Sequence, residues 1–134
     1  MKQYSVQQEL HKELEELGAK DMELCMQCGL CTGTCPYRLV PGEASEEFNI
    51  RLVQRLGQLG LEGFESDDLW RCVTCNTCVL HCPRGLKIID IIRSMRMMMN
   101  ETGTVPASLK VPLGSVSNRG NPWSGNPEDR TKWA

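Results

Sequence analysis

The sequence predicts an all-α fold, from the helical spacing of its apolar residues and from a long helical segment between two cysteine-rich runs. Apolar residues recur at helical spacing in residues 5–17, 45–59 and 83–102. The segment between Cys35 and Cys72 holds 36 residues of mostly helical pattern. Beyond residue 102 the periodicity vanishes. We therefore expect a helical domain over residues 1–102 and an extended tail over residues 103–134.

The first expected helix covers residues 5–17. Ser5 can cap its N-terminus, with Gln8 three residues later, and Gly18 is expected to end it. One apolar stripe follows the helical period: Val6, Leu10, Leu14 and Leu17. His11 lies on this helix, and we expect its side chain to be solvated.

The second expected helix begins with Ser45 as its N-cap and with two acidic residues, Glu46 and Glu47, in its first turn. Its apolar positions are Phe48, Leu52, Val53, Leu56 and Leu59. Three glycines are expected to break it up towards its end: Gly57, Gly60 and Gly63. Their spacing is not G-x-G-x-x-G and follows no strand, which excludes a dinucleotide site. A further helical turn is expected at residues 66–70.

The third expected helix starts at Pro83, because the missing N–H of proline costs nothing at the first helical position. Its broad apolar face is formed by Leu86, Ile88, Ile89, Ile91, Ile92, Met95, Met98 and Met99, and Gly103 ends it. Cys82 stands just before this helix. We therefore expect the positive end of the helix dipole to favour its thiolate.

All eight cysteines fall in two runs of the same form, C-x2-C-x2-C-x3-C-P, which cover residues 25–36 and 72–83. This spacing is typical of proteins with two 4Fe–4S clusters, in which three cysteines of one run and the fourth of the other hold each cluster. Three sulfurs in one tight loop can reach three irons of a cube, while the fourth has left the loop. The predicted ligand sets are Cys25, Cys28, Cys31 and Cys82 for cluster 1, and Cys72, Cys75, Cys78 and Cys35 for cluster 2.

Two other uses of eight cysteines are less consistent with this pattern. Zinc takes four ligands from two C-x2-C pairs, which would leave the third cysteine and the C-P ending of each run without a role. A disulfide framework is disfavoured because such close neighbours bridge poorly and because the sequence shows no sign of secretion.

The length of the spacer favours the all-helical ferredoxin architecture, since small βαβ ferredoxins place their two runs close together among strands. The chain has only two Phe, two Tyr and three Trp, so we expect metal binding to supply much of the folding energy.

The formal charge of the chain, -2, argues against a nucleic-acid partner. Four charged residues interrupt the most apolar stretch, residues 86–99, so no bilayer span is expected. With unpaired thiolates and no export signal, we expect a cytoplasmic protein.

The tail combines loop-forming residues with residue types that are common in interfaces. Four of the seven prolines and two of the three tryptophans lie beyond residue 102. Trp123, Trp133, Arg119 and Arg130 are of the types over-represented among interface hot spots. We therefore expect the tail to bind a partner protein.

Taken together, these motifs resemble the heterodisulfide reductase C-subunit family. The similar segments are residues 59–61 and 70–72, Cys82-Pro83-Arg84-Gly85-Leu86, and Asn118-Arg119-Gly120-Asn121-Pro122-Trp123 followed by Asp129-Arg130 and Trp133-Ala134. In fused relatives a similar segment leads into a catalytic module rich in Cys-Cys-Gly motifs. This chain stops near that point, so the resemblance implies that this module is a separate polypeptide, the B subunit.

The resemblance implies a non-catalytic electron-transfer subunit of an oxidoreductase complex. Such a protein relays electrons between the A subunit, which holds flavin and iron–sulfur clusters, and the B subunit with its Cys-Cys-Gly motifs, where a disulfide is reduced. Trp123, Arg130 and Trp133 of the tail are expected at the interface with the B subunit. The substrate stays open between a thiol-cofactor heterodisulfide and another acceptor or donor. Two alternatives are the iron–sulfur subunit of a succinate or glycerol-3-phosphate dehydrogenase, and a zinc-stabilised interaction module.

Overall fold

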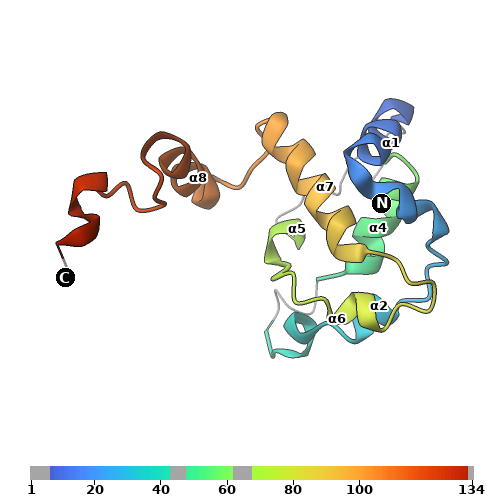
Figure 1. Cartoon of the computed structure of the whole chain (residues 1–134). Coiled ribbons are helices and arrows are strands. Elements are labelled where there is room, and N and C mark those ends of the chain that lie inside the picture. Colours follow the sequence, from blue (N-terminus) through green and yellow to red (C-terminus); the bar gives the residue numbers. More distant parts are fainter. Residues whose placement is uncertain (1–6, 43–47, 62–67, 133–134) are drawn as a thin grey trace. The chain divides into compact units, whose positions relative to one another are not determined.

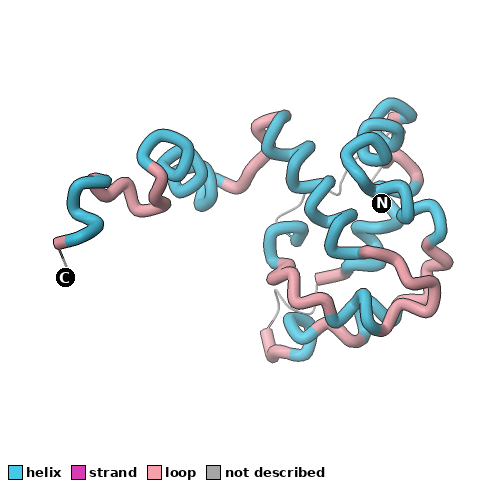
Figure 2. The backbone as a smooth tube through the Cα atoms, in the orientation of Figure 1, coloured by secondary structure: helices cyan, strands magenta, loops and turns pink. Residues whose placement is uncertain are grey.

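The computed structural model describes residues 7–42, 48–61 and 68–132, and the chain divides into two compact units, Met1–Thr102 and Gly103–Ala134 (Figure 1). Helices and loops make up both units, and these described ranges contain no strand (Figure 2). The predicted all-α class is therefore confirmed. Within the same ranges, none of the helices combines the length and apolar character that a membrane span requires.

The first unit begins with α1 (Gln8–Leu14), which continues into the π-helical turn η1 (Glu15–Ala19) and the 3-10 helix η2 (Lys20–Leu24). Gly18, within η1, adopts φ 110° and kinks the chain there, so the helix breaks where the sequence predicts. Leu14 is fully buried. The predicted cap Ser5 and the first stripe residue Val6 lie outside the described residues.

Helix α4 (Ile50–Gln58) begins later than predicted. Its N-cap is Asn49, whose side chain accepts a hydrogen bond of 3.0 Å from the backbone N–H of Leu52. The predicted first turn, residues 45–47, lies outside the described residues. The predicted apolar stripe is wrong at two positions, because Leu52 is 46% exposed and Leu59 is 44% exposed. The buried face consists of Ile50, Val53, Gln54, Leu56 and Gly57.

Gly57 is a packing residue and does not break the helix, contrary to the prediction. It lies inside α4, and a Cβ at this position would meet the side chains of Met95, Met22 and Leu14. The absent side chain therefore lets α4 approach the rest of the core closely. The helix ends instead just before Gly60, which adopts φ 59°.

Helix α7 (Ile88–Glu101) is the central element of the first unit and contacts α1, η1, η2, α5 (Asp68–Arg71) and α6 (Thr77–Leu80) (Figure 1). It begins at Ile88 and not at Pro83, because a turn at Pro83 and a left-handed Gly85 (φ 66°) come first. Cys82 is therefore not at a helix N-terminus, and the expected dipole effect on its thiolate is wrong. The helix ends before Gly103, as predicted.

The second unit is not an extended tail. It holds α8 (Ala107–Arg119), with Pro112 inside the helix, and the 3-10 helix η4 (Pro127–Thr131). The prolines and glycines suggested irregular structure, but Gly120 ends α8 in a left-handed conformation (φ 66°), as helix-terminating glycines do. Trp133, one of the predicted interface residues, lies outside the described residues.

The close packing at Gly57 gives the first prediction. Gly57→Val places a branched side chain against Met95 and Met22, so the free energy of unfolding of the cluster-loaded protein should fall by roughly 1–3 kcal/mol. Gly114→Val is the matched control, because a Cβ at Gly114, also inside a helix, meets nothing within 4 Å. Chemical unfolding of both variants checks this. Equal stability of the two would contradict the packing role of Gly57.

Candidate metal centre

The two cysteine runs fold into loops of the same unusual conformation. In each loop two residues adopt positive φ: Gln27 (60°) and Gly29 (85°) in the first, Thr74 (55°) and Asn76 (68°) in the second. Positive φ is uncommon outside glycine, and such strained residues gather at functional sites. Loops of this kind can turn successive backbone N–H groups towards one anion. The repeated conformation therefore indicates two similar anionic centres.

Each loop leads into a four-residue helix that delivers the third cysteine. Helix α2 (Leu30–Gly33) carries Cys31, and α6 carries Cys78; both thiols are buried. The helices α2 and α6 contact each other (Figure 1). Because they contact, the chain brings two cysteine runs that are far apart in sequence to one place.

The structure collects the cysteines around two cavities. Cys25, Cys28, Cys31 and Cys82 line the first cavity, and Cys72, Cys75, Cys78 and Cys35 line the second. Cys35 thus lies with the second run and Cys82 with the first, so the structure brings together both sets named from the sequence. None of the eight cysteines is in a disulfide. Four convergent thiols per cavity are the donor set of a 4Fe–4S cluster, so the residues present fit that group.

Polar side chains contact the sulfur atoms in both loops. The side-chain amide of Gln27 donates a hydrogen bond of 3.3 Å to Cys25 Sγ. The hydroxyl of Thr77 lies 3.4 Å from Cys75 Sγ, and this hydrogen bond lowers the pKa of the Cys75 thiol. Hydrogen bonds to ligand sulfurs tune the reduction potential of an iron–sulfur cluster.

Burial acts in the opposite direction on three other thiols. It raises the pKa of Cys31 and of Cys72, and it raises the pKa of Cys78 to about 12, helped by the neighbouring charges of Cys72 and Cys31. These thiols therefore keep their protons at neutral pH until a metal replaces them.

Arg96 of α7 supplies a positive charge beside the second cavity. Its guanidinium donates to the carbonyl oxygens of Leu69, at 2.7 and 3.1 Å, and of Cys72, at 2.5 Å. It also lies 5.2 Å from the centroid of the Trp70 ring. The charge of Arg96 counteracts the effect of burial on the pKa of Cys72. Sequence reasoning missed this residue, because no local motif links it to Cys72.

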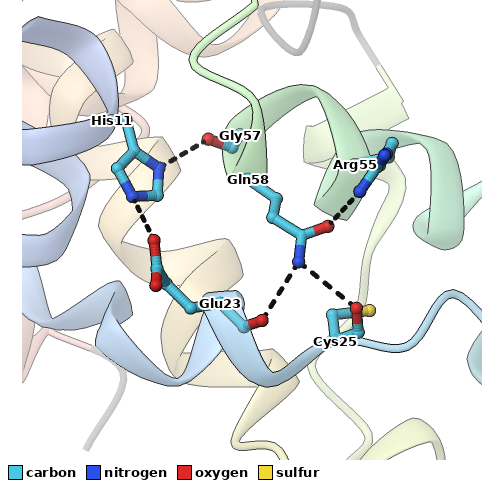
Figure 3. A network of polar contacts seen from close by, with 6 residues as sticks. All are labelled: His11, Glu23, Cys25, Arg55, Gly57 and Gln58. Carbon is cyan, nitrogen blue, oxygen red and sulfur yellow. Dashed lines mark hydrogen bonds and ion pairs between the residues drawn. The ribbon is translucent and has the colours of Figure 1, made fainter. Parts of the chain in front are cut away.

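A network of polar contacts holds the segment that leads into the first cysteine loop, at Glu23 and Cys25 (Figure 3). The amide of Gln58 donates to the carbonyl oxygens of Glu23, at 3.1 Å, and Cys25, at 3.2 Å. The ring of His11 contacts the carbonyl oxygen of Gly57 at 3.2 Å and the carboxylate of Glu23 at 2.9 Å. The prediction of a solvated His11 is therefore wrong, since its ring joins α1, α4 and η2.

The chain is similar to known iron–sulfur proteins. A family described as a 4Fe-4S dicluster domain matches residues 24–86, and a second family of the same description matches residues 1–40. The iron-sulfur C subunit of the CoB–CoM heterodisulfide reductase of Methanopyrus kandleri is 41% identical over 91 residues, which cover 66% of this chain and 45% of the relative. The C subunit of the ferredoxin/F(420)H(2)-dependent CoB-CoM heterodisulfide reductase of Methanosarcina acetivorans is 39% identical over 97 residues, which cover 72% of this chain and 56% of the relative.

The helical fold, the two cysteine cavities and the matched domain define an all-α protein that carries two 4Fe–4S clusters. Within this class the chain is a homologue of the heterodisulfide reductase C subunits, which confirms the resemblance seen in the sequence. The chain spans about half the length of the curated relatives it matches.

The raised thiol pKa values predict that iron uptake depends on pH. Cys31, Cys72 and Cys78 must each lose a proton to bind iron, so anaerobic reconstitution should load more iron at about pH 8.5 than at about pH 6.5. Iron and sulfide analysis measures the loading. Thr77→Val removes the bond that lowers the pKa of Cys75 and should move the uptake curve to higher pH.

The matched control is Thr34→Val in the first run, because the Thr34 hydroxyl bonds the carbonyl oxygen of Leu30 and no sulfur. Its uptake curve should follow that of the unmodified chain. Uptake that does not change with pH would contradict the account.

Proposed function

We propose that the chain is the electron-transfer subunit of a heterodisulfide reductase-like complex. In this proposal it carries electrons between an A-like subunit with flavin and iron–sulfur clusters and a B-like subunit with Cys-Cys-Gly motifs. Cys25, Cys28, Cys31 and Cys82 hold cluster 1, and Cys72, Cys75, Cys78 and Cys35 hold cluster 2. Each cluster supplies one-electron storage when bound. Because all eight thiols are committed to iron and need a reducing compartment, the proposed location is the cytoplasm.

The observation that carries the proposal is the pair of cavities, each lined by four cysteines. A site for substrate turnover needs reactive groups beyond the ligands of its electron carriers. The thiols are all used by the two ligand sets, and the curated relatives are named as subunits of larger enzymes. A relay between other subunits therefore accounts for the residues better than catalysis within this chain.

Each cavity also has a cysteine at the protein surface, which suits an electron carrier with two partners. Cys28 of the first cavity and Cys75 of the second are exposed. Exposed apolar side chains accompany both in the sequence: Met26 and Leu30 stand two residues from Cys28, and Val73 stands two residues before Cys75. Apolar side chains beside a redox centre favour close docking of a partner, which electron transfer requires.

The second unit supports the proposal of a partner-binding segment. Asn121 organises a compact turn: its side-chain oxygen accepts from the backbone N–H of Trp123 at 2.9 Å, and its amide donates to the carbonyl oxygen of Gly125 at 2.8 Å. Ser115 is buried and donates to the carbonyl oxygen of Asn121 at 2.7 Å. Arg130 donates to the carbonyl oxygen of Gly120 at 3.0 Å. This turn presents Trp123 with 87% of its surface exposed.

A tryptophan held in a fixed turn loses little conformational freedom when a partner covers it, so it makes an efficient interface anchor. We therefore propose that Trp123, with Arg130 and Trp133, contacts the B-like subunit. Truncation of the whole unit would also remove α8, so a single substitution gives the cleaner test.

The experiment is anaerobic purification of the tagged full-length chain from its own cells, with mass spectrometry of the proteins that remain bound. A flavoprotein and a protein with Cys-Cys-Gly motifs should copurify. Trp123→Ala should weaken binding of the latter roughly 30-fold, as loss of a hot spot of about 2 kcal/mol does. Both clusters should remain, because Trp123 lies in the other unit.

Met97→Ala is the control, since Met97 is also an exposed apolar residue but lies on α7. It should retain both partners. Copurification without any flavoprotein would contradict the relay, and undiminished binding by Trp123→Ala would contradict the role of the second unit.

A further inference from the structure

Gln54 is the least expected residue of the helical core. It lies on the buried face of α4 and is 1% exposed, among Ile50, Val53 and Leu56. Neither the amide nitrogen nor the amide oxygen of its side chain has a hydrogen-bond partner in the described part of the chain. A buried polar group without a partner is destabilising, because it has given up its hydrogen bonds to water, so Gln54 calls for a partner that the polypeptide does not supply.

The position of Gln54 in the wall of the first cavity indicates what kind of partner this is. Gln54 is part of the wall of the first cavity, together with Cys25, Cys28, Cys31 and Cys82. The sulfurs of an iron–sulfur cluster in this cavity are hydrogen-bond acceptors and carry negative charge. The amide N–H of Gln54 is a donor without an acceptor, and it lies in the wall of a cavity that suits a group rich in acceptors. The unpaired donor of Gln54 and the acceptor sulfurs of a cluster are therefore complementary.

The second cavity differs in this respect. Its wall consists of its four cysteines and of Pro36, Tyr37, Ile50, Val73 and Ile89, with no side-chain amide among them. One other side chain in the described ranges has a buried atom without a partner, the indole nitrogen of Trp70. Trp70 lines neither cysteine cavity. The unpaired amide is therefore a feature of the first cavity.

We infer that the side-chain amide of Gln54 donates a hydrogen bond to a sulfur of cluster 1 and raises the reduction potential of that cluster alone. Reduction adds one electron and makes the cluster more negative, so a hydrogen bond from the protein stabilises the reduced state more than the oxidised state. The inference rests on the proposed placement of cluster 1. Gln54 would then help to make two similar clusters unequal, which fixes the order in which they take electrons.

The test compares the holoprotein with Gln54→Met, which keeps the length of the side chain but cannot donate. Reductive titration followed by electron paramagnetic resonance gives a midpoint potential for each cluster. Gln54→Met should lower the equilibrium constant for reduction of cluster 1 roughly tenfold. For a one-electron couple this lowers the midpoint potential by about 59 mV. Cluster 2 should be unchanged. The signals are assigned with Cys28→Ser, which perturbs only the cluster in the first cavity.

Two further variants sharpen the result. Gln54→Glu places an acid of the same shape in the cavity wall, and as a carboxylate it should lower the potential of cluster 1 further than Gln54→Met. Leu59→Met is the control, because it introduces methionine next to the same helix at an exposed position. It should leave both potentials unchanged.

Unchanged potentials in Gln54→Met, with both clusters present, would overturn the inference and leave the proposed relay intact. An equal shift of both clusters would also overturn it, since that reports a general loosening of the fold. If Gln54→Met fails to load cluster 1, protein with both Gln27→Met and Gln58→Met, labelled with ¹⁵N in the glutamine amides, decides the matter, because the amides of Gln27 and Gln58 also bond Cys25. Nitrogen coupling to reduced cluster 1 supports the inference, and its absence overturns it.

Discussion

The proposed exchange of the fourth cysteine between the two runs is the constraint on which the rest of the fold depends. Cys35 lies at the cavity of the second run and Cys82 at the cavity of the first, so with the proposed ligand sets neither centre is completed by one run alone. The two loops must therefore lie side by side, as the contact between α2 and α6 allows. Helix α7 contacts α6 as well as α1, and its buried face belongs to the hydrophobic core. Metal binding and formation of the helical core are thus linked.

Two loops of the same backbone conformation are placed in different surroundings. The first cavity has the buried neutral amide of Gln54 and two arginines, Arg51 and Arg84, in its wall, while the guanidinium of Arg96, held by backbone carbonyls, stands beside the second. The neighbouring side chains differ although the cysteine spacing is identical. Potentials of iron–sulfur clusters respond to charge, hydrogen bonds and solvent exposure. The internal repeat therefore supplies two centres, and the residues of α4 and α7 make them different.

Much of the fold could be predicted because the signals are local. The cysteine spacing gave the two sets that line the cavities, and helical periodicity gave the all-α class. Helix starts were less predictable: Pro83 suits a first helical position, but the turn before Gly85 delays α7 to Ile88. The second unit was misjudged because its prolines and glycines suggested irregular structure, whereas local hydrogen bonds centred on Asn121 make this segment compact.

The candidate site beyond the cysteines could not be predicted, since its residues act across long separations in the sequence. Arg96 reaches the carbonyl of Cys72 from α7, and His11 joins α4 to η2. Gln54 follows no motif, and within an amphipathic helix its amide is indistinguishable from a surface glutamine. Only the packing of α4 against the first cavity shows that it is buried.

The central claim is crossed ligation, and paired cysteine variants test it most directly. Cys28→Ser and Cys75→Ser, at exposed matching positions of the two runs, define the paramagnetic resonance signals of clusters 1 and 2. Crossed ligation predicts that Cys35→Ser changes the signal that Cys75→Ser changes, and that Cys82→Ser changes the signal that Cys28→Ser changes. The unmodified chain should hold about eight irons and eight sulfides. If Cys35→Ser instead perturbs the signal altered by Cys28→Ser, each run holds its own cluster and the account is wrong.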